Sequence, residues 1–281
     1  MEAYASHCAK GLAATLNAST YGNGSQTIVL SHGYGANSSI WHNIIPLLAI
    51  CFKVLVYDLA FSPNVKTKLY DPARYSNYSA YAQDLTCILD ELKVKKSIFV
   101  GHSMSAMIGG IAATQRPGLF KHLVLLNGSP RYLNDEKARY KGGFSQYQVD
   151  SIFDSIKKNY TAWVQGFAPV AIGVNNKDAI LEFKRSLLRL SSQVALSTAK
   201  VVFLSDYRDV LPRVGVPTTI IQSQSDTIVP NPVAQYMQRK LGAQAKAKLR
   251  ILNTTGHFLQ LTDPALLVRV LKEVIINANK V

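Results

Sequence analysis

A serine between small residues is the clearest chemical signal in this 281-residue chain. Ser103 follows an apolar segment, 97–100, and precedes a proline-free segment that can be helical, with Gly101 and Ser105 two residues to either side. Small residues at these two positions let a chain turn sharply from a strand into a helix and expose the central hydroxyl. The pattern therefore predicts a nucleophilic serine, and the N–H groups of the following helix can stabilise an oxyanion.

A nucleophilic serine needs a general base and an acid that orients the base. Of the six histidines, His257 fits the base best, because it stands in a Gly-His turn after an alternating apolar segment, 249–252. Asp226 fits the acid, because it follows the buried strand expected at 217–222. The alternatives are a surface histidine and a helix-capping aspartate. The chain order serine, acid, histidine favours the catalytic interpretation.

Two backbone N–H groups should complete this site. One belongs to Met104, directly after the serine, and the other to Tyr34, in the His-Gly-Tyr-Gly turn after an early strand. The alternative for that turn is a flexible loop without a role in catalysis. Together with the serine motif, the turn predicts an oxyanion hole and the α/β-hydrolase fold.

Strand-like and helix-like segments alternate along the chain, and elements in this order can bring the predicted site residues together. Strands are expected near 27–31, 52–57, 97–101, 122–127, 217–222 and 248–252, with one or two more within 9–22, and helices near 38–49, 78–92, 104–115, 231–241 and 264–278. This alternation predicts a mostly parallel sheet of about seven to eight strands with helices on both faces.

The segment 131–206 breaks the alternation, because its apolar residues follow helical spacing throughout. We expect a helical lid inserted into a core formed by 1–130 and 207–281, above the carboxyl ends of the strands. Its aromatic residues belong either to ordinary helix packing or to an apolar ligand cavity. The residues expected to line that cavity are Phe144, Trp163, Phe167 and Phe203. The expected ligand is small and apolar, with one electrophilic carbonyl near Ser103.

The chain is strongly basic, with 31 Lys and Arg against 17 Asp and Glu and a net charge of +14. Such a balance allows nucleic acid, acidic lipid or an acidic protein as partner. The basic residues are dispersed, however, and the densest runs, 93–96 and 246–250, are short. No nucleic-acid-binding motif accompanies them. We therefore expect a solvated surface first and an acidic protein partner second.

Three cysteines, Cys8, Cys51 and Cys87, are widely spaced and odd in number. This argues against a disulfide framework and for a reducing compartment. No Cys/His cluster has the spacing of metal ligands, so neither a metal nor a cofactor is expected. We also expect no signal peptide and no membrane-spanning helix.

The segment 101–109 resembles the nucleophile turn of the plant strigolactone and karrikin receptor hydrolases, including Ser105 in place of the usual glycine. The resemblance covers about residues 8 to 275 and is most specific in the expected helical lid. Further matching segments are 129–135, 142–144, 159–163, 166–169, 195–197 and 203–208. Tyr132 favours the karrikin-insensitive branch over the DWARF strigolactone branch.

The resemblance implies a four-helix lid over a ligand cavity to which Tyr34 and Tyr132 also contribute. It implies binding and slow cleavage of a butenolide by Ser103, with His257 as base and Asp226 as its orienter. It further implies an F-box protein with leucine-rich repeats and a Clp-ATPase-like repressor as partners, in cytoplasm and nucleus. The alternative is a general small-ester serine hydrolase with no role in signalling.

Overall fold

A seven-stranded sheet forms the centre of the computed structural model, which describes residues 8–66 and 69–279. The strands lie in the order β1-β3-β2-β4-β5-β6-β7, and only β1 is antiparallel to its neighbour. Their bounds are β1 Ser19–Tyr21, β2 Thr27–Ser31, β3 Lys53–Val56, β4 Ser97–His102, β5 Phe120–Leu126, β6 Thr218–Ser225 and β7 Lys248–Thr255. The expected α/β-hydrolase fold, with a mostly parallel sheet, is confirmed.

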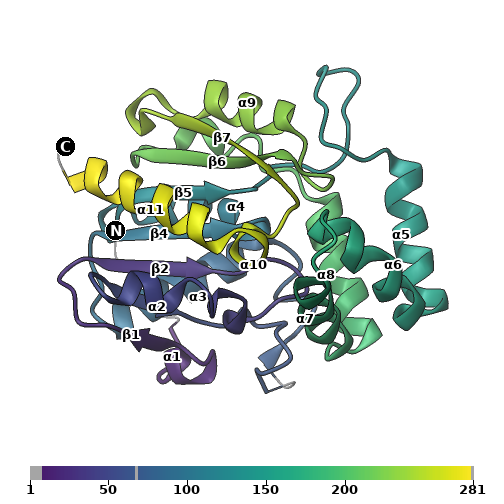
Figure 1. Cartoon of the computed structure of the whole chain (residues 1–281), viewed down its shortest axis with the longest axis horizontal. Helices are drawn as coiled ribbons and strands as arrows, with labels where there is room; N and C mark the ends of the chain where they lie inside the picture. The colour runs from purple at the N-terminus through teal and green to yellow at the C-terminus, as the bar shows by residue number, and fades with distance from the viewer. Residues whose placement is uncertain (1–7, 67–68, 280–281) are drawn as a thin grey trace.

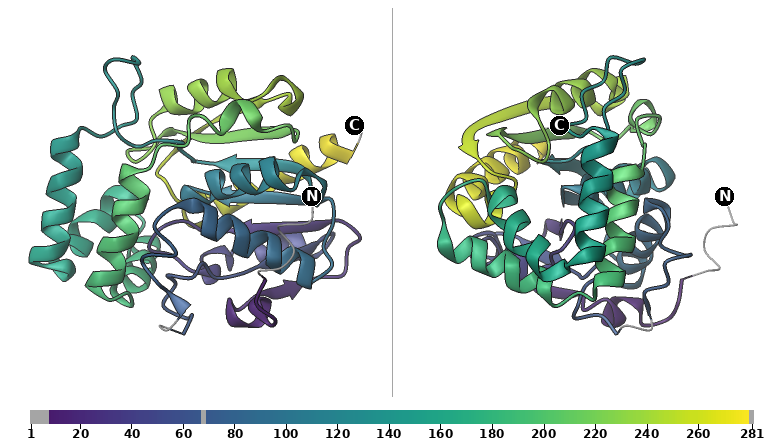
Figure 2. Two further views of the ribbon diagram at one scale, coloured as in Figure 1. Left: turned by 180° about the vertical axis from the view of Figure 1, so that it is seen from behind. Right: turned by 90° about the vertical axis from the view of Figure 1, so that its right-hand side faces the viewer.

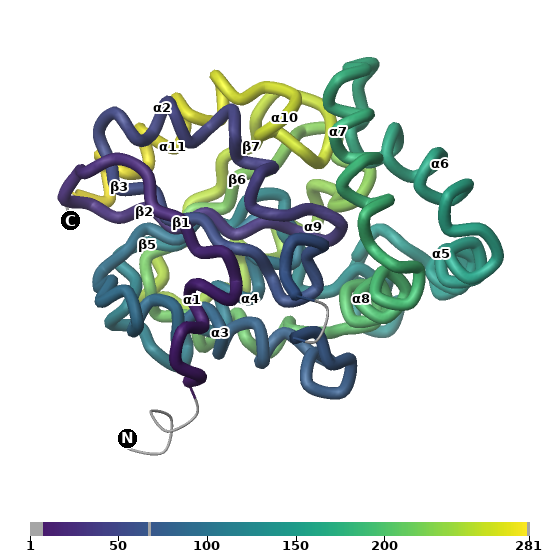
Figure 3. Tube along the Cα trace, turned by 90° about the horizontal axis from the view of Figure 1, so that it is seen from below, coloured from purple at the N-terminus to yellow at the C-terminus, as the bar shows by residue number. Residues whose placement is uncertain are grey.

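Helices cover both faces of the sheet. Figure 3 shows α2 and α11 on one side and α3 and α4 on the other. The bounds are α1 Leu12–Thr15, α2 Ile45–Ala49, α3 Tyr78–Glu91, α4 Met104–Gln115, α9 Asn231–Lys240, α10 Leu259–Thr262 and α11 Pro264–Asn279. The central strand β4 is buried along its whole length, which agrees with the apolar side chains at 98–100 in its centre.

One expected helix is divided in the structure. A single helix was predicted over 38–49, but the chain forms a 3-10 turn at Ser38–Trp41 and then α2. Pro46 lies in the first turn of α2, where its missing N–H is tolerated, and it prevents a helix from running through from the preceding turn. The short helices α1 and α10 were not predicted, because four residues carry too little periodicity.

Four helices lie between β5 and β6: α5 Gln146–Lys158, α6 Tyr160–Ile172, α7 Lys177–Leu188 and α8 Ser192–Leu204. They gather on the side of the sheet toward which the parallel strands run (Figures 1 and 2). A capping box of Ser145 and Gln148 starts α5, and Gly173, at φ 74°, ends α6. In the described part of the chain no single helix is long and apolar enough to cross a membrane. The helices α7 and α8 reach that length and apolar content only as a pair, and they meet at a bend of 107°.

The cysteine prediction is wrong, because Cys8 and Cys87 form a disulfide. The two residues are 79 positions apart, but α1 packs against α3, which carries Cys87. Spacing along the chain could not reveal this contact. Cys51 is exposed and unbridged. The sequence argument for a reducing compartment therefore loses its basis, since a disulfide persists best under oxidising conditions.

Candidate active site

Ser103 occupies the sharp turn between β4 and α4. Its backbone has φ 58° and ψ −123°, a conformation that non-glycine residues rarely adopt. The turn is tight enough that a Cβ on Gly101 would collide with the backbone of Ser105. The Ser105 hydroxyl donates to the carbonyl of His32, which links this turn to the loop after β2. Serine at 105 is therefore accommodated by a hydrogen bond.

A hydrogen-bonded relay joins the three residues predicted to act together. Ser103 Oγ lies 2.9 Å from His257 Nε2, and His257 Nδ1 lies 2.7 Å from Asp226 Oδ2. All three side chains are buried. The other oxygen of Asp226 accepts the N–H groups of Ile228 and Val229, at 2.8 and 3.1 Å. With Nδ1 protonated toward the carboxylate, Nε2 is free to accept the serine proton.

Tyr132 reaches the nucleophile directly. Its hydroxyl lies 3.2 Å from Ser103 Oγ. Because Ser103 donates its proton to His257, the phenol must be the donor in this pair. Burial raises the pKa of Tyr132 above its ordinary value, so the phenol keeps its proton. The sequence placed Tyr132 in the ligand cavity, and the structure adds this contact with Ser103.

The two predicted oxyanion donors flank Ser103. Met104 is the first residue of α4, and neither its N–H nor that of Tyr34 donates to a backbone carbonyl within residues 8–66 and 69–279. The turn of Tyr34 lies against the nucleophile, because a Cβ on Gly33 would be 2.8 Å from Ser103 Cβ. The Tyr34 hydroxyl donates to the carbonyl of Ala195 in α8, at 3.0 Å. This arrangement suits the predicted role, which remains a prediction.

Two further side chains hold the base in place. His102 Nε2 donates to the carbonyl of His257 at 2.8 Å, and Asn127 Nδ2 donates to the same oxygen at 3.0 Å. Burial, and then the charge of His257, lower the pKa of His102 well below 6.5, so its imidazole is neutral. No role was assigned to His102 from the sequence. No local signal could have shown a contact with a residue 155 positions away.

The loops that carry the acid and the base are bound to the end of α6. The N–H of His257 donates to Ala171 O, and the hydroxyl of Thr227 donates to Val170 O, both at 2.9 Å. The last carbonyls of a helix have no partner within the helix. In α6 two of them, the carbonyls of Val170 and Ala171, accept from the two loops beside Ser103, so these loops and α6 form one packed unit.

The chamber around Ser103 is almost closed, with a volume of about 20 Å³. This is about the space that one water molecule needs. Its walls are Tyr34, Ser103, Tyr132, Phe167, Phe183, Val202, Phe203, Ile228, His257 and Phe258. Four predicted cavity residues are among them: Tyr34, Tyr132, Phe167 and Phe203. Phe183 and Phe258 were missed, although Phe258 directly follows the predicted base.

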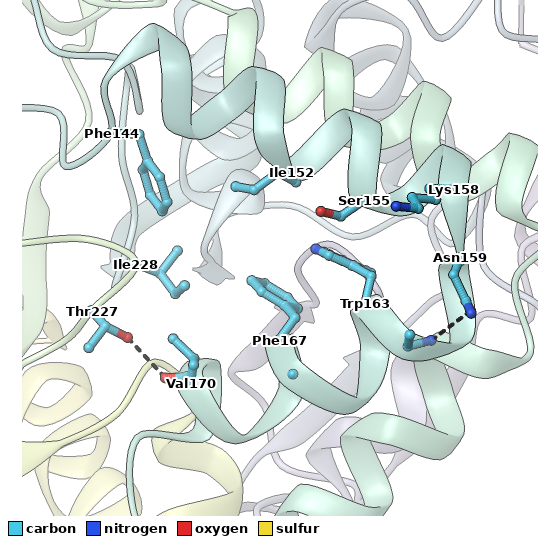
Figure 4. Close-up of a pocket in the computed structure, with 12 residues that line it drawn as sticks. Phe144, Ile152, Ser155, Lys158, Asn159, Trp163, Phe167, Val170, Thr227 and Ile228 are labelled. Atoms are coloured by element: carbon cyan, nitrogen blue, oxygen red, sulfur yellow. Dashed lines mark hydrogen bonds between the residues drawn. The ribbon is translucent and has the colours of Figure 1, made fainter.

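A larger cavity of about 690 Å³ lies beside this chamber, between α5 and α6 (Figure 4). The predicted residues Phe144 and Trp163 line this outer cavity and not the chamber at Ser103. Figure 4 shows Phe167 and Ile228 pointing into it. Both residues also line the inner chamber, so they separate the two spaces.

Known proteins are similar to this chain in sequence and in fold. Residues 26–264 match the family described as alpha/beta hydrolase fold. The chain is 41% identical to karrikin insensitive 2 receptor CA of Petunia hybrida, over 91% of this chain and 93% of that protein. It is 40% identical to a strigolactone esterase of Arabidopsis thaliana, over 92% and 95%. The solved structure of a hydrolase from Oleispira antarctica matches with a TM-score of 0.90 at 30% identity, covering 95% of this chain and 96% of that one.

Proposed function

The chain belongs to the α/β-hydrolase family, in the group of the plant karrikin and strigolactone receptors, and we propose that it is a butenolide receptor that cleaves its ligand slowly through Ser103. The observation that supports this most is the relay from Ser103 through His257 to Asp226 beneath an aromatic chamber. The two relatives named above bear receptor and esterase names at nearly equal identity. Tyr132 is our reason for favouring the karrikin-insensitive branch.

The reaction follows from the relay. His257 Nε2 takes the proton of Ser103 while Ser103 Oγ attacks the carbonyl carbon of the butenolide. The N–H groups of Tyr34 and Met104 hold the negative charge that develops on the carbonyl oxygen. The ring C–O bond then breaks, and the departing oxygen takes the proton from His257. The product is an acyl-serine, which water hydrolyses with His257 again as base, or whose acyl group passes to His257.

Slow turnover is consistent with the closed chamber. A space of about 20 Å³ cannot admit a lactone, whereas the outer cavity of about 690 Å³ can. A ligand must therefore displace Phe167 or Ile228 to reach Ser103. In this proposal α5–α8 act as a lid, and their opening limits the rate, as lid motion does in many hydrolases.

The same four helices offer a surface for a signalling partner. They expose the apolar side chains of Tyr147 (81% accessible), Val170 and Leu204. We include in the proposal an F-box protein with leucine-rich repeats and a Clp-ATPase-like repressor as partners, in cytoplasm and nucleus, where the Cys8–Cys87 pair would be reduced. These parts rest on the family resemblance.

The test compares two profluorescent butenolides, with and without the ring methyl group, with a simple acetate ester. We expect slow butenolide cleavage that Ser103→Ala abolishes and that Ser151→Ala, an exposed serine in α5, leaves unchanged. The methyl preference then assigns the branch. Rapid acetate turnover without butenolide cleavage would instead favour a general small-ester hydrolase. Butenolide cleavage retained in Ser103→Ala would remove Ser103 from the mechanism.

A further inference from the structure

A third cavity, of about 510 Å³, lies at the end of the sheet opposite Ser103. It forms where β4, β5, β6 and β7 begin, and the last turns of α11 close it. Figure 1 shows the end of α11 on the side of the sheet away from α5–α8. Neighbouring parallel strands begin at the same edge, so residues far apart in sequence converge there. The cavity is therefore separate from the proposed active site.

Positive charge is concentrated around this cavity. Its cationic lining residues are Lys96, Lys121, Lys246, Lys248 and Arg250. Arg250 pairs with Glu273 at 2.8 Å, and the Lys121 ammonium donates to the amide oxygen of Asn279 at 2.8 Å. Across residues 8–66 and 69–279, none of the four lysines has a carboxylate partner within 4.0 Å. Several positive charges around one concave space raise its affinity for anions.

The floor of the cavity is apolar and holds one buried imidazole. Phe120 and Val274 are buried, and Pro217 lies beside them. His122 Nε2 lies 2.9 Å from the hydroxyl of Thr219. Burial, and then the charge of Lys248, lower the pKa of His122 to about 4, so the ring is neutral at pH 7. The imidazole thus experiences the positive field of the cavity.

We propose that this cavity binds a small organic polyanion, with a multiply charged phosphate group among the lysines and an apolar or aromatic portion against Phe120, Pro217 and Val274. Its volume lies within the usual range of small-molecule sites. A single phosphate carries a charge of about −2 and would neutralise only part of the lysine charge, which favours a di- or triphosphate. A concave site of this size suits a small molecule better than a protein surface.

The test uses ATP and inorganic tripolyphosphate as probes, measured by calorimetry at low and at physiological ionic strength. We expect saturable binding with one site per chain, tighter for ATP because its ring contacts the apolar floor. Lys121→Gln/Lys248→Gln should weaken binding roughly tenfold or more, because charged hydrogen bonds are lost. Lys177→Gln/Lys200→Gln removes the same charge from exposed positions in α7 and α8 and should change binding less than about twofold.

Equal weakening in the two double variants would overturn the proposal, because binding would then reflect only the net charge of the chain. Absence of saturable binding by either probe would also overturn it. Polyglutamate serves as a third probe, and its binding without that of ATP or tripolyphosphate would overturn the proposal and assign this face to an acidic protein. Equal affinity for the two probes would overturn the apolar part of the proposal. The single variant Lys248→Gln changes one exposed residue and should leave the fold intact, so weaker binding by this variant reflects loss of binding and not loss of folding. The NMR signals of the His122 ring should also shift when ATP binds.

Discussion

Replacing Gly256 with alanine should slow butenolide cleavage about a hundredfold, because the added methyl group has no room beside α6. Gly256 has φ 102°, and a Cβ there would overlap the carbonyl oxygen of Ile172. From the other side, a Cβ on Gly173 would lie 2.8 Å from Gly256 Cα. The end of α6 and the loop before His257 therefore touch backbone to backbone, with no side chain between them.

The size of the effect follows from this overlap. Real Cβ atoms essentially never approach other heavy atoms within 3.0 Å, so the two backbones would have to separate by about 1 Å. That movement would stretch the bond from the His257 N–H to Ala171 O and displace the base from Ser103. A misplacement of about 1 Å can lower a rate about 10²-fold. The strained φ should also cost about 1–3 kcal/mol of folding free energy.

The assay is the initial rate of butenolide hydrolysis, measured with urea unfolding of the same preparation. Gly110→Ala is the matched control, because a Cβ at Gly110 in α4 would make only ordinary contacts, the nearest at 3.6 Å. It should keep the wild-type rate and be neutral or slightly more stable, since alanine favours helices. A folded Gly256→Ala protein with the wild-type rate would refute the idea that contact with α6 positions His257.

Three further predictions concern other parts of the chain. Tyr132→Phe should lower kcat about fivefold, the value of one neutral hydrogen bond to Ser103, while leaving the fold intact; an unchanged kcat would show that the phenol only packs there. The pKa of His122 is about 4 in the folded chain and near 6.5 when unfolded, so the unfolded state binds more protons between these values. Protonation of His122 in the unfolded chain should therefore lower the free energy of unfolding by about 2–3 kcal/mol from pH 7 to 4.5. Urea titrations at the two pH values should show this decrease in the wild type and not in His122→Gln. Reducing the Cys8–Cys87 disulfide should lower the free energy of unfolding by about 2–5 kcal/mol, and a Cys8→Ser variant should show no response to reductant.

The sequence allowed the fold and the residues of the relay to be predicted because their signals are local. Small residues around Ser103 reveal a tight turn, alternating segments reveal a parallel sheet, and chain order connects Asp226 with His257. The structure confirms the fold and brings these three residues together.

Features that depend on packing between distant segments could not be predicted. The donation from His102 to the carbonyl of His257 crosses 155 positions, and the Cys8–Cys87 disulfide crosses 79. Neither leaves a pattern in its neighbourhood. Likewise, the spacing of aromatic residues shows that they lie inside the protein but not which of two adjoining spaces they line. Phe144 and Trp163 line only the outer cavity, whereas Phe203 lines only the chamber at Ser103.

The closed chamber at Ser103 also determines what a measured affinity means. If ligand binds at Ser103 only when Phe167 or Ile228 has moved aside, the apparent Kd is the intrinsic Kd divided by the fraction of molecules that are open. An open fraction of about 1% would weaken apparent binding about 100-fold with every contact to the ligand intact. Two ligands with equal contacts would then share this factor, whereas a change that enlarges the chamber, such as Phe167→Ala, would strengthen binding of both. Sensitivity to a ligand at a given concentration would thus be set as much by an internal equilibrium of the empty protein as by the chemistry of the ligand.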